Sequence, residues 1–190
     1  MGNNYRMAFM FVPKPQEMNL DVMRSHWALI HFDIHGDSIV AFIGTLNIDS
    51  DQQLDILEAK RKLSLPDYEM LNLVIEHFGD DLEKGILRQN ILLNIAFEKI
   101  LHRIKDVQIM RWGEDLYEGN KRLTVSSVST TFVSVKIHLG ICINPELDNG
   151  FVGLTKYSID PVELAEVICN QYRADMRRLR KKCWHIKPVI

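Results

Sequence analysis

The stretch "RLTVSSVSTTFVSVKIHLGICIN" (residues 122–144) carries the clearest strand pattern of the chain. From Val133 onward every second residue is apolar, and Lys136 and His138 lie among the residues between. Successive side chains of a strand point to opposite faces, so the pattern predicts a strand over residues 132–144 with an apolar face inward and a polar face opposite. Residues 122–129 are rich in Ser, Thr and Val, and we expect them to pair back as a hairpin on a strand at residues 107–112.

Further strands are predicted on both sides of this hairpin. Runs of β-branched and aromatic residues predict strands over residues 5–12, 27–34 and 38–44, and a weak edge strand over 151–157. A tight turn at Gly36 and Asp37 separates the second of these strands from the third.

Helices are predicted in the middle and at the end of the chain. Apolar residues at helical spacing predict helices over residues 51–63, 66–78 and 82–105. Asp160 caps a last helix over residues 161–184, with Pro161 in its first turn. Strands in hairpins with helices grouped apart predict a single α+β domain over residues 1–190, whose mixed, largely antiparallel sheet is flanked by helices.

The composition excludes several classes of protein. Hydrophobic residues make up 46% and charged residues 25% of the 190, and the formal net charge is −2. We therefore expect neither a membrane span nor an overall attraction to nucleic acid. The three cysteines form no zinc pattern and no disulfide framework, so we expect no metal and a reducing, cytoplasmic location.

Two clusters of charged residues could each be a functional site or simply a solvated surface. His31, Asp33 and His35 would share one face of the predicted strand, as metal ligands or as a solvated strand end. The cations between Arg173 and Lys182 would complement the dipole at a helix end or contact phosphates. In both cases the solvated interpretation is the simpler one.

The late hairpin is the strongest candidate for a binding site. Lys136 and His138 point to the same side of the predicted strand, and the facing strand offers Thr124 and Ser126, with Ser127 nearby. Small hydroxyl residues leave volume for a ligand and supply hydrogen bonds. The alternative is a wet polar face, which many antiparallel sheets have.

The runs "GDSIVAFIG", "MLNLVIEHF", "RQNILLNIAFE" and "GEDLYEGNKRLTVSSVSTTFVSVKIHLGI" resemble an uncharacterised prokaryotic family known as domain of unknown function 366. That family is grouped with the biotin/lipoate protein ligases and the class II aminoacyl-tRNA synthetases. The resemblance implies a ligase-like fold and a small-molecule ligand, and it allows a homodimer. In the ligases a hairpin Lys contacts the acyl carboxylate and the adenylate phosphate. Its matching position here is Arg122, or Lys121 if the register slips by one residue.

The resemblance also implies roles for individual residues. Lys121 or Arg122 would bind an anionic group, and Asp115 would orient that cation. Ser126 would hydrogen-bond the ligand, and His138 would lie near its reacting end. Arg111 and Lys136 complete the predicted site.

The chain also departs from the ligases. It has no counterpart of their Arg- and Gly-rich nucleotide loop, and Val125 replaces the Gly of their Lys-Ile-Ser-Gly run. Ligase activity, ATP use and a cofactor are therefore not implied. We expect an acyl- or nucleotidyl-transfer enzyme acting on a carboxylate or phosphate-bearing ligand, a non-catalytic binding module, or a tRNA-associated protein that uses its basic last helix.

Overall fold

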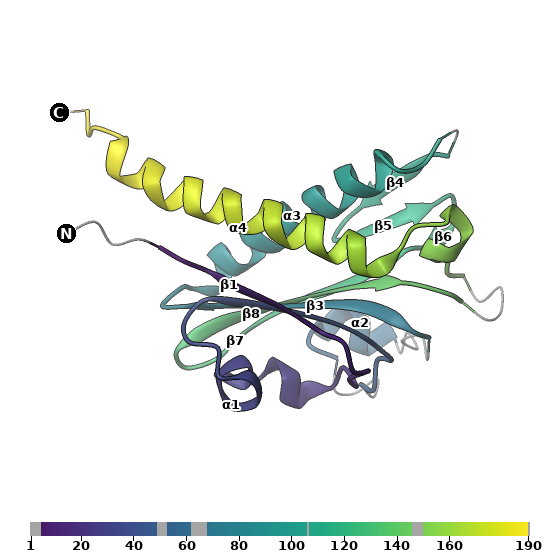
Figure 1. Cartoon of the computed structure of the whole chain (residues 1–190), viewed down its shortest axis with the longest axis horizontal. Helices are drawn as coiled ribbons and strands as arrows, with labels where there is room; N and C mark the ends of the chain where they lie inside the picture. The colour runs from purple at the N-terminus through teal and green to yellow at the C-terminus, as the bar shows by residue number, and fades with distance from the viewer. Residues whose placement is uncertain (1–4, 49–52, 62–67, 106, 146–149, 190) are drawn as a thin grey trace.

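The computed structural model describes residues 5–48, 53–61, 68–105, 107–145 and 150–189. The strands are β1 (Ala8–Val12), β2 (Ser38–Gly44), β3 (Met70–Phe78), β4 (Ile109–Trp112), β5 (Asp115–Glu118), β6 (Lys121–Arg122), β7 (Thr124–Thr130) and β8 (Ser134–Cys142). The helices are η1 (Leu20–Met23), α1 (Trp27–Phe32), α2 (Ile56–Arg61), α3 (Leu82–Leu101), η3 (Leu154–Tyr157) and α4 (Pro161–His185). Figure 1 shows α3 and α4 above the main sheet and α1 below it.

The main sheet has the strand order β1-β2-β3-β8-β7, and a small sheet has the order β4-β5-β6. Only the β1–β2 pair in these sheets is parallel, and the other neighbours are antiparallel. The α+β class with a mixed, largely antiparallel sheet is therefore confirmed. The register places His138 of β8 between Val74 of β3 and Ser127 of β7.

Apolar layers cover both faces of the main sheet. We call the side packed by α3 and α4 the α4 face, and it includes Leu73 and Ile137. The opposite side, packed by η1 and α1, is the α1 face, and it includes Val74 and Phe42. Gly85 lets α3 approach the sheet closely, since a Cβ there would lie 2.3 Å from a methyl carbon of Val135.

The strand predicted at residues 27–34 is wrong, because the chain forms α1 there. Residues His26 and Asp33 bracket this helix in the left-handed conformation, with φ of 63° and 54°. The parallel pairing of β1 with β2 requires a crossover over one face of the sheet, and α1 belongs to that crossover. The turn at Gly36 therefore leads into β2 without forming a hairpin with residues 27–34.

The helix predicted at residues 66–78 is also wrong, because residues 70–78 form the central strand β3. Residues 66 and 67, with the supposed first turn, lie outside the described residues. The strand is buried on both faces, so its apolar residues do not alternate. Its polar side chains, Asn72, Glu76 and His77, are buried and hydrogen-bonded.

The remaining elements agree in part with the predictions. The helices predicted at residues 82–105 and 161–184 are confirmed as α3 and α4, and the Asp160 side chain accepts a hydrogen bond from the Glu163 amide. Of the helix predicted at residues 51–63, α2 covers 56–61, while 51–52 and 62–63 lie outside the described residues.

The predicted pairings near the late hairpin need two corrections. Strand β4 pairs with β5, and β7 pairs with β8, so residues 107–112 and 122–129 do not form the predicted hairpin. The edge strand predicted at residues 151–157 reduces to a bridge at Phe151 followed by η3. Within the described residues, no helix combines the length and apolar character needed to cross a bilayer.

Candidate functional site

A recess opens on the α1 face where β7 and β8 meet the segment that precedes α2. Its volume, counted to the open mouth, is about 450 Å³. The lining combines apolar with polar side chains: Leu46, Ile48, Gln53, Leu54, Asp55, Val125, Ser126, Ser127 and His138. No Lys or Arg contributes to this lining in the ranges that the structure describes.

His138 projects from the middle of β8, and its side chain is fixed by Asn72 of the neighbouring strand. The Nε2 atom of His138 lies 2.9 Å from Oδ1 of Asn72. The amide nitrogen of Asn72 donates to the carbonyl oxygens of Gly44 and Met70, at 3.0 and 3.2 Å. The orientation of the Asn72 amide is thereby determined, so its Oδ1 must accept a hydrogen bond from the Nε2–H group of His138.

His138 is therefore a neutral imidazole protonated on Nε2, with a lone pair on Nδ1. Burial lowers the pKa of His138 to about 4, so the ring stays uncharged at neutral pH. Among the described residues Nδ1 has no hydrogen-bond partner. The ring is 3% exposed and lines the recess. It offers an acceptor to a ligand there.

Lys136 shares the α1 face with His138 but belongs to a closed network beneath α1. Its Nζ lies 3.4 Å from Oε2 of Glu76, and both side chains are buried. The other oxygen of Glu76 accepts from the amide of His26 and the hydroxyl of Ser134, at 2.9 and 2.7 Å. Burial lowers the pKa of Lys136, and the charge of Glu76 opposes that effect. The Trp27 ring lies over the ammonium, 5.9 Å away. The predicted polar face of β8 is therefore covered rather than solvated.

Arg122 and Asp115 form a second cluster, next to the small sheet. Their side chains form an ion pair, and the Thr124 hydroxyl donates to Asp115 over 3.1 Å. Nε of Arg122 donates to the Thr124 carbonyl oxygen, 2.9 Å away. Asp115 is buried and Arg122 is half-buried. Neither residue lines the recess.

The other predicted site residues lie apart from the recess or point away from it. The Ser126 side chain points to the α4 face, where it accepts from Gln89 of α3 and donates to the Glu114 carbonyl. The Arg111 guanidinium donates to Asn90 and Asn94, also on α3. Lys121 is exposed on β6. Ser126 is therefore part of the recess lining because of its place on β7, while its hydroxyl points to the other face of the sheet.

The predicted site therefore divides into separate groups. Of the predicted residues, only His138 offers a side-chain hydrogen-bonding atom to the recess, and Ser127 replaces Ser126 beside it. Sequence reasoning missed Asn72 and the wall formed by Leu46, Leu54 and Asp55. An Asn within an apolar run, recognised as a buried strand, would have indicated a hydrogen-bonded partner nearby.

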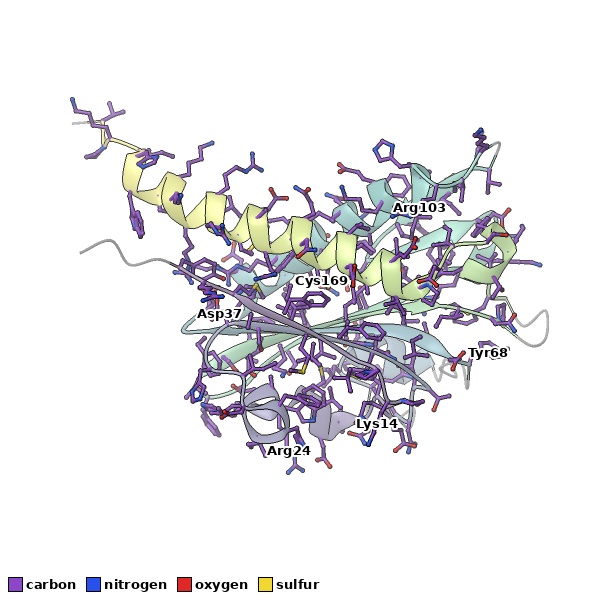
Figure 2. The ribbon with its side chains drawn as sticks, in the orientation of Figure 1. Lys14, Arg24, Asp37, Tyr68, Arg103 and Cys169 are labelled. Atoms are coloured by element: carbon purple, nitrogen blue, oxygen red, sulfur yellow. The ribbon has the colours of Figure 1, made fainter. Side chains whose placement is uncertain are left out.

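Metal binding has no support in the described part of the chain. No group of three or more His, Cys, Asp or Glu residues gathers there in an arrangement that could hold an ion. His35 and Asp33 form an exposed pair at 3.3 Å beyond the end of α1. Figure 2 shows Asp37 and Tyr68 at opposite ends of the sheet, and Cys169 on α4, where it is buried.

The chain resembles proteins whose function is not known over nearly its whole length. The model of the family described as domain of unknown function (DUF366) matches residues 7–187. An uncharacterised protein of Methanocaldococcus jannaschii is 35% identical over 193 residues, which cover 97% of this chain and 86% of that protein. The solved structure of a protein of unknown function from Pyrococcus horikoshi is 26% identical, with a TM-score of 0.82, and the match covers 96% of this chain and 100% of that one.

A more distant likeness concerns the fold alone. A putative lipoate protein ligase from T. acidophilum, solved with bound lipoic acid, is 11% identical, with a TM-score of 0.54. The match covers 87% of this chain and 84% of that chain. Biotin protein ligases share the same architecture. The predicted biotin/lipoate ligase-like fold is confirmed, and so is the predicted family resemblance.

Proposed function

The chain belongs to the DUF366 family, and we propose that it binds a small organic molecule in the recess beside His138. The observation that carries the proposal is a recess of about 450 Å³ whose wall is mainly apolar and includes a buried, oriented imidazole. Ligand sites in proteins combine a mainly apolar wall with a few well-placed polar groups. Nδ1 of His138 has no partner among the described residues and can accept a hydrogen bond from a ligand.

The fold neighbours support the proposal at the level of architecture. The solved neighbours include a ligase with bound lipoic acid and one with biotin, so this architecture accommodates small ligands in those proteins. Function does not follow from fold, so the ligand of this chain is argued from its own residues.

Binding without turnover is the form of the proposal that the geometry favours. Transfer to a carboxylate or phosphate by Lys121 or Arg122 stays a prediction. The Arg122 guanidinium is already engaged by Asp115 and by the Thr124 carbonyl, and it does not line the recess. Incubating the chain with any ligand found, with and without ATP, and measuring release of product separates an enzyme from a binding module.

The proposal is tested by filling the recess. Ser127 lines the recess. Ser129 lies on the same face of β7, two residues further along the strand, and is not part of the lining. We expect Ser127→Phe to abolish binding of the co-purified or screened ligand, while Ser129→Phe retains it. Ligand is detected by mass spectrometry of the denatured, natively purified protein, and affinity by calorimetry. Equal binding by both variants would show that the ligand lies elsewhere.

The tRNA-associated alternative depends on the basic end of α4. Arg177, Arg178, Lys181, Lys182 and His185 line a hollow there of about 800 Å³. Phosphate contacts release counterions, so binding to tRNA would weaken steeply as salt rises. A filter-binding series between low and physiological salt tests this, and an affinity insensitive to salt would exclude the basic end as the binding surface.

A further inference from the structure

We infer that the recess selects an uncharged molecule that donates an N–H or O–H to Nδ1 of His138, and that it rejects carboxylates and phosphates at that point. The inference rests on the proposed function, because it names the class of ligand for the same recess. It also departs from the sequence-based expectation of an anionic ligand.

The first step is the direction of the hydrogen bond at His138. The Asn72 amide nitrogen is held by two backbone carbonyls, so its oxygen is the atom that meets Nε2 of His138. Nε2 must carry the proton, and the neutral ring then leaves Nδ1 as an acceptor. An anion placed against that lone pair would meet repulsion instead of a hydrogen bond, whereas an amide, urea, alcohol or protonated ring nitrogen would donate to it.

The second step is the charge of the surrounding wall. No Lys or Arg belongs to the lining among the described residues, so this wall offers an anionic ligand no cation. A buried anion without a partner is far costlier than a buried neutral polar group. Leu46, Ile48, Leu54 and Val125 supply apolar wall for the body of the ligand.

The third step concerns the nearest buried cation. Lys136 lies two residues from His138 on the same face, but its ammonium faces Glu76 and Trp27 under α1. Recruiting it for a ligand anion would leave the buried Glu76 carboxylate without its cation. The ammonium therefore serves the network under α1 and does not supply the charge that an anionic ligand needs.

The tautomer of His138 tests the first step without any ligand. Two-dimensional NMR of the 15N-labelled protein reports which ring nitrogen carries the proton. We expect an Nε2–H imidazole with unprotonated Nδ1 at neutral pH, and His138→Gln identifies the signals of His138 by their loss. An Nδ1–H tautomer in the native chain would overturn the inference on its own.

Matched pairs of probes test the selectivity. We would measure the affinity of butanamide against butanoate, octanamide against octanoate, and lipoamide against lipoate, by calorimetry on the full chain. We expect the amide of each binding pair to bind roughly tenfold more tightly or better, since the carboxylate is desolvated without a partner. His138→Phe should reduce that preference several-fold, because it removes the acceptor for the amide N–H, and His138→Gln, which keeps an acceptor, should retain more of it.

The outcomes separate this inference from the proposed function. If amide and carboxylate bind equally, or the carboxylate binds better, the inference is wrong while binding in the recess stands. If no probe binds and the natively purified chain holds no ligand that Ser127→Phe displaces, the proposed function fails and the inference fails with it. If His138→Phe does not fold, His138→Leu carries the comparison, and an unchanged amide preference in it would refute the role of His138.

Discussion

Replacing Glu76 with Gln should destabilise the chain by leaving a buried ammonium without its counter-charge. The Glu76 and Lys136 side chains are 2% and 1% exposed, with 3.4 Å between Oε2 and Nζ. At an effective dielectric constant of about 20, unit charges at that separation attract by about 5 kcal/mol. Gln keeps an oxygen for the amide of His26 and the hydroxyl of Ser134, so those hydrogen bonds survive. Part of the lost attraction is offset because Gln costs less to bury, and we expect a net loss of about 3–5 kcal/mol in the free energy of unfolding.

The charge of Lys136 makes this loss depend on pH. Burial lowers the pKa of Lys136, and the variant lacks the carboxylate that opposes this effect. The folded variant therefore holds the lysine neutral at a pH where the unfolded chain, with a lysine pKa of about 10.4, still binds the proton. The unfolded state binds more protons, so the free energy of unfolding of Glu76→Gln should rise relative to the native chain as pH rises toward the lysine pKa of the unfolded chain.

Urea denaturation at 25 °C, followed by circular dichroism, measures both effects. The matched control is the double variant Glu76→Gln with Lys136→Met, which removes both charges and should recover most of the lost stability. A single variant within about 0.5 kcal/mol of the native chain would refute the buried-pair argument, since such small values are usual for surface changes. So would a double variant as unstable as the single one.

Three further results are expected. His138→Gln should make the free energy of unfolding depend less on pH in acid. The pKa of His138 is lowered to about 4 in the folded chain, so the unfolded chain binds a proton first as pH falls from about 6.5. Between pH 6.5 and pH 4 the free energy of unfolding of the native chain should therefore fall by about 3 kcal/mol relative to that of the variant, as measured by urea denaturation. Gly44→Ala should lower stability by more than about 4 kcal/mol in urea denaturation, because its Cβ would lie 1.6 Å from the Gln16 carbonyl oxygen, whereas Gly36→Ala, with open space and a φ of 79°, should cost about 1–2 kcal/mol. Arg122→Ala should lower the free energy of unfolding by about 2–3 kcal/mol, because it removes the guanidinium that faces buried Asp115. The same variant should bind ligand with unchanged affinity. Loss of affinity in calorimetry would show that the ligand binds at the small sheet.

The sequence predicts correctly those helices and strands that have one apolar face and one polar face. Helix α3 has a broad apolar stripe and an Asp81 cap, and α4 has Asp160 and Pro161 at its start, so both are found at their predicted places. Strand β8 is found as predicted, with Lys136 covered by α1 and His138 lining the recess. Alternation reports the direction of side chains, and it does not report what covers them.

The two wrong elements fail for a related reason. Residues 70–78 are apolar on both faces, so spacing alone cannot distinguish a buried strand from a buried helix. The polar residues in that run, such as Glu76 and Asn72, are explained only by partners on other elements. In residues 27–32 the short helix is fixed by the crossover between β1 and β2 rather than by local preference.

The candidate site could be predicted only in part. His138 was identified from its place on β8, while the recess wall comes from segments around residues 46–55 that are distant in sequence. The hairpin cation was expected beside His138, but the small sheet holds Arg122 against Asp115 instead. Which residues converge on a recess depends on strand order, which the sequence pattern does not specify.

The contact between α4 and the segment before β1 has a consequence for the order of folding. Nε of Arg173, on α4, donates to the Met7 carbonyl oxygen just before β1, across 166 residues, and Figure 1 shows both termini at the same end of the molecule. Strands β2, β3, β7 and β8 and helix α3 all precede α4 in the chain, so they can assemble first, and the part of the α4 face that α4 covers then stays exposed. The apolar side chains under α4 are therefore covered last, and docking of α4 is the step that completes the core.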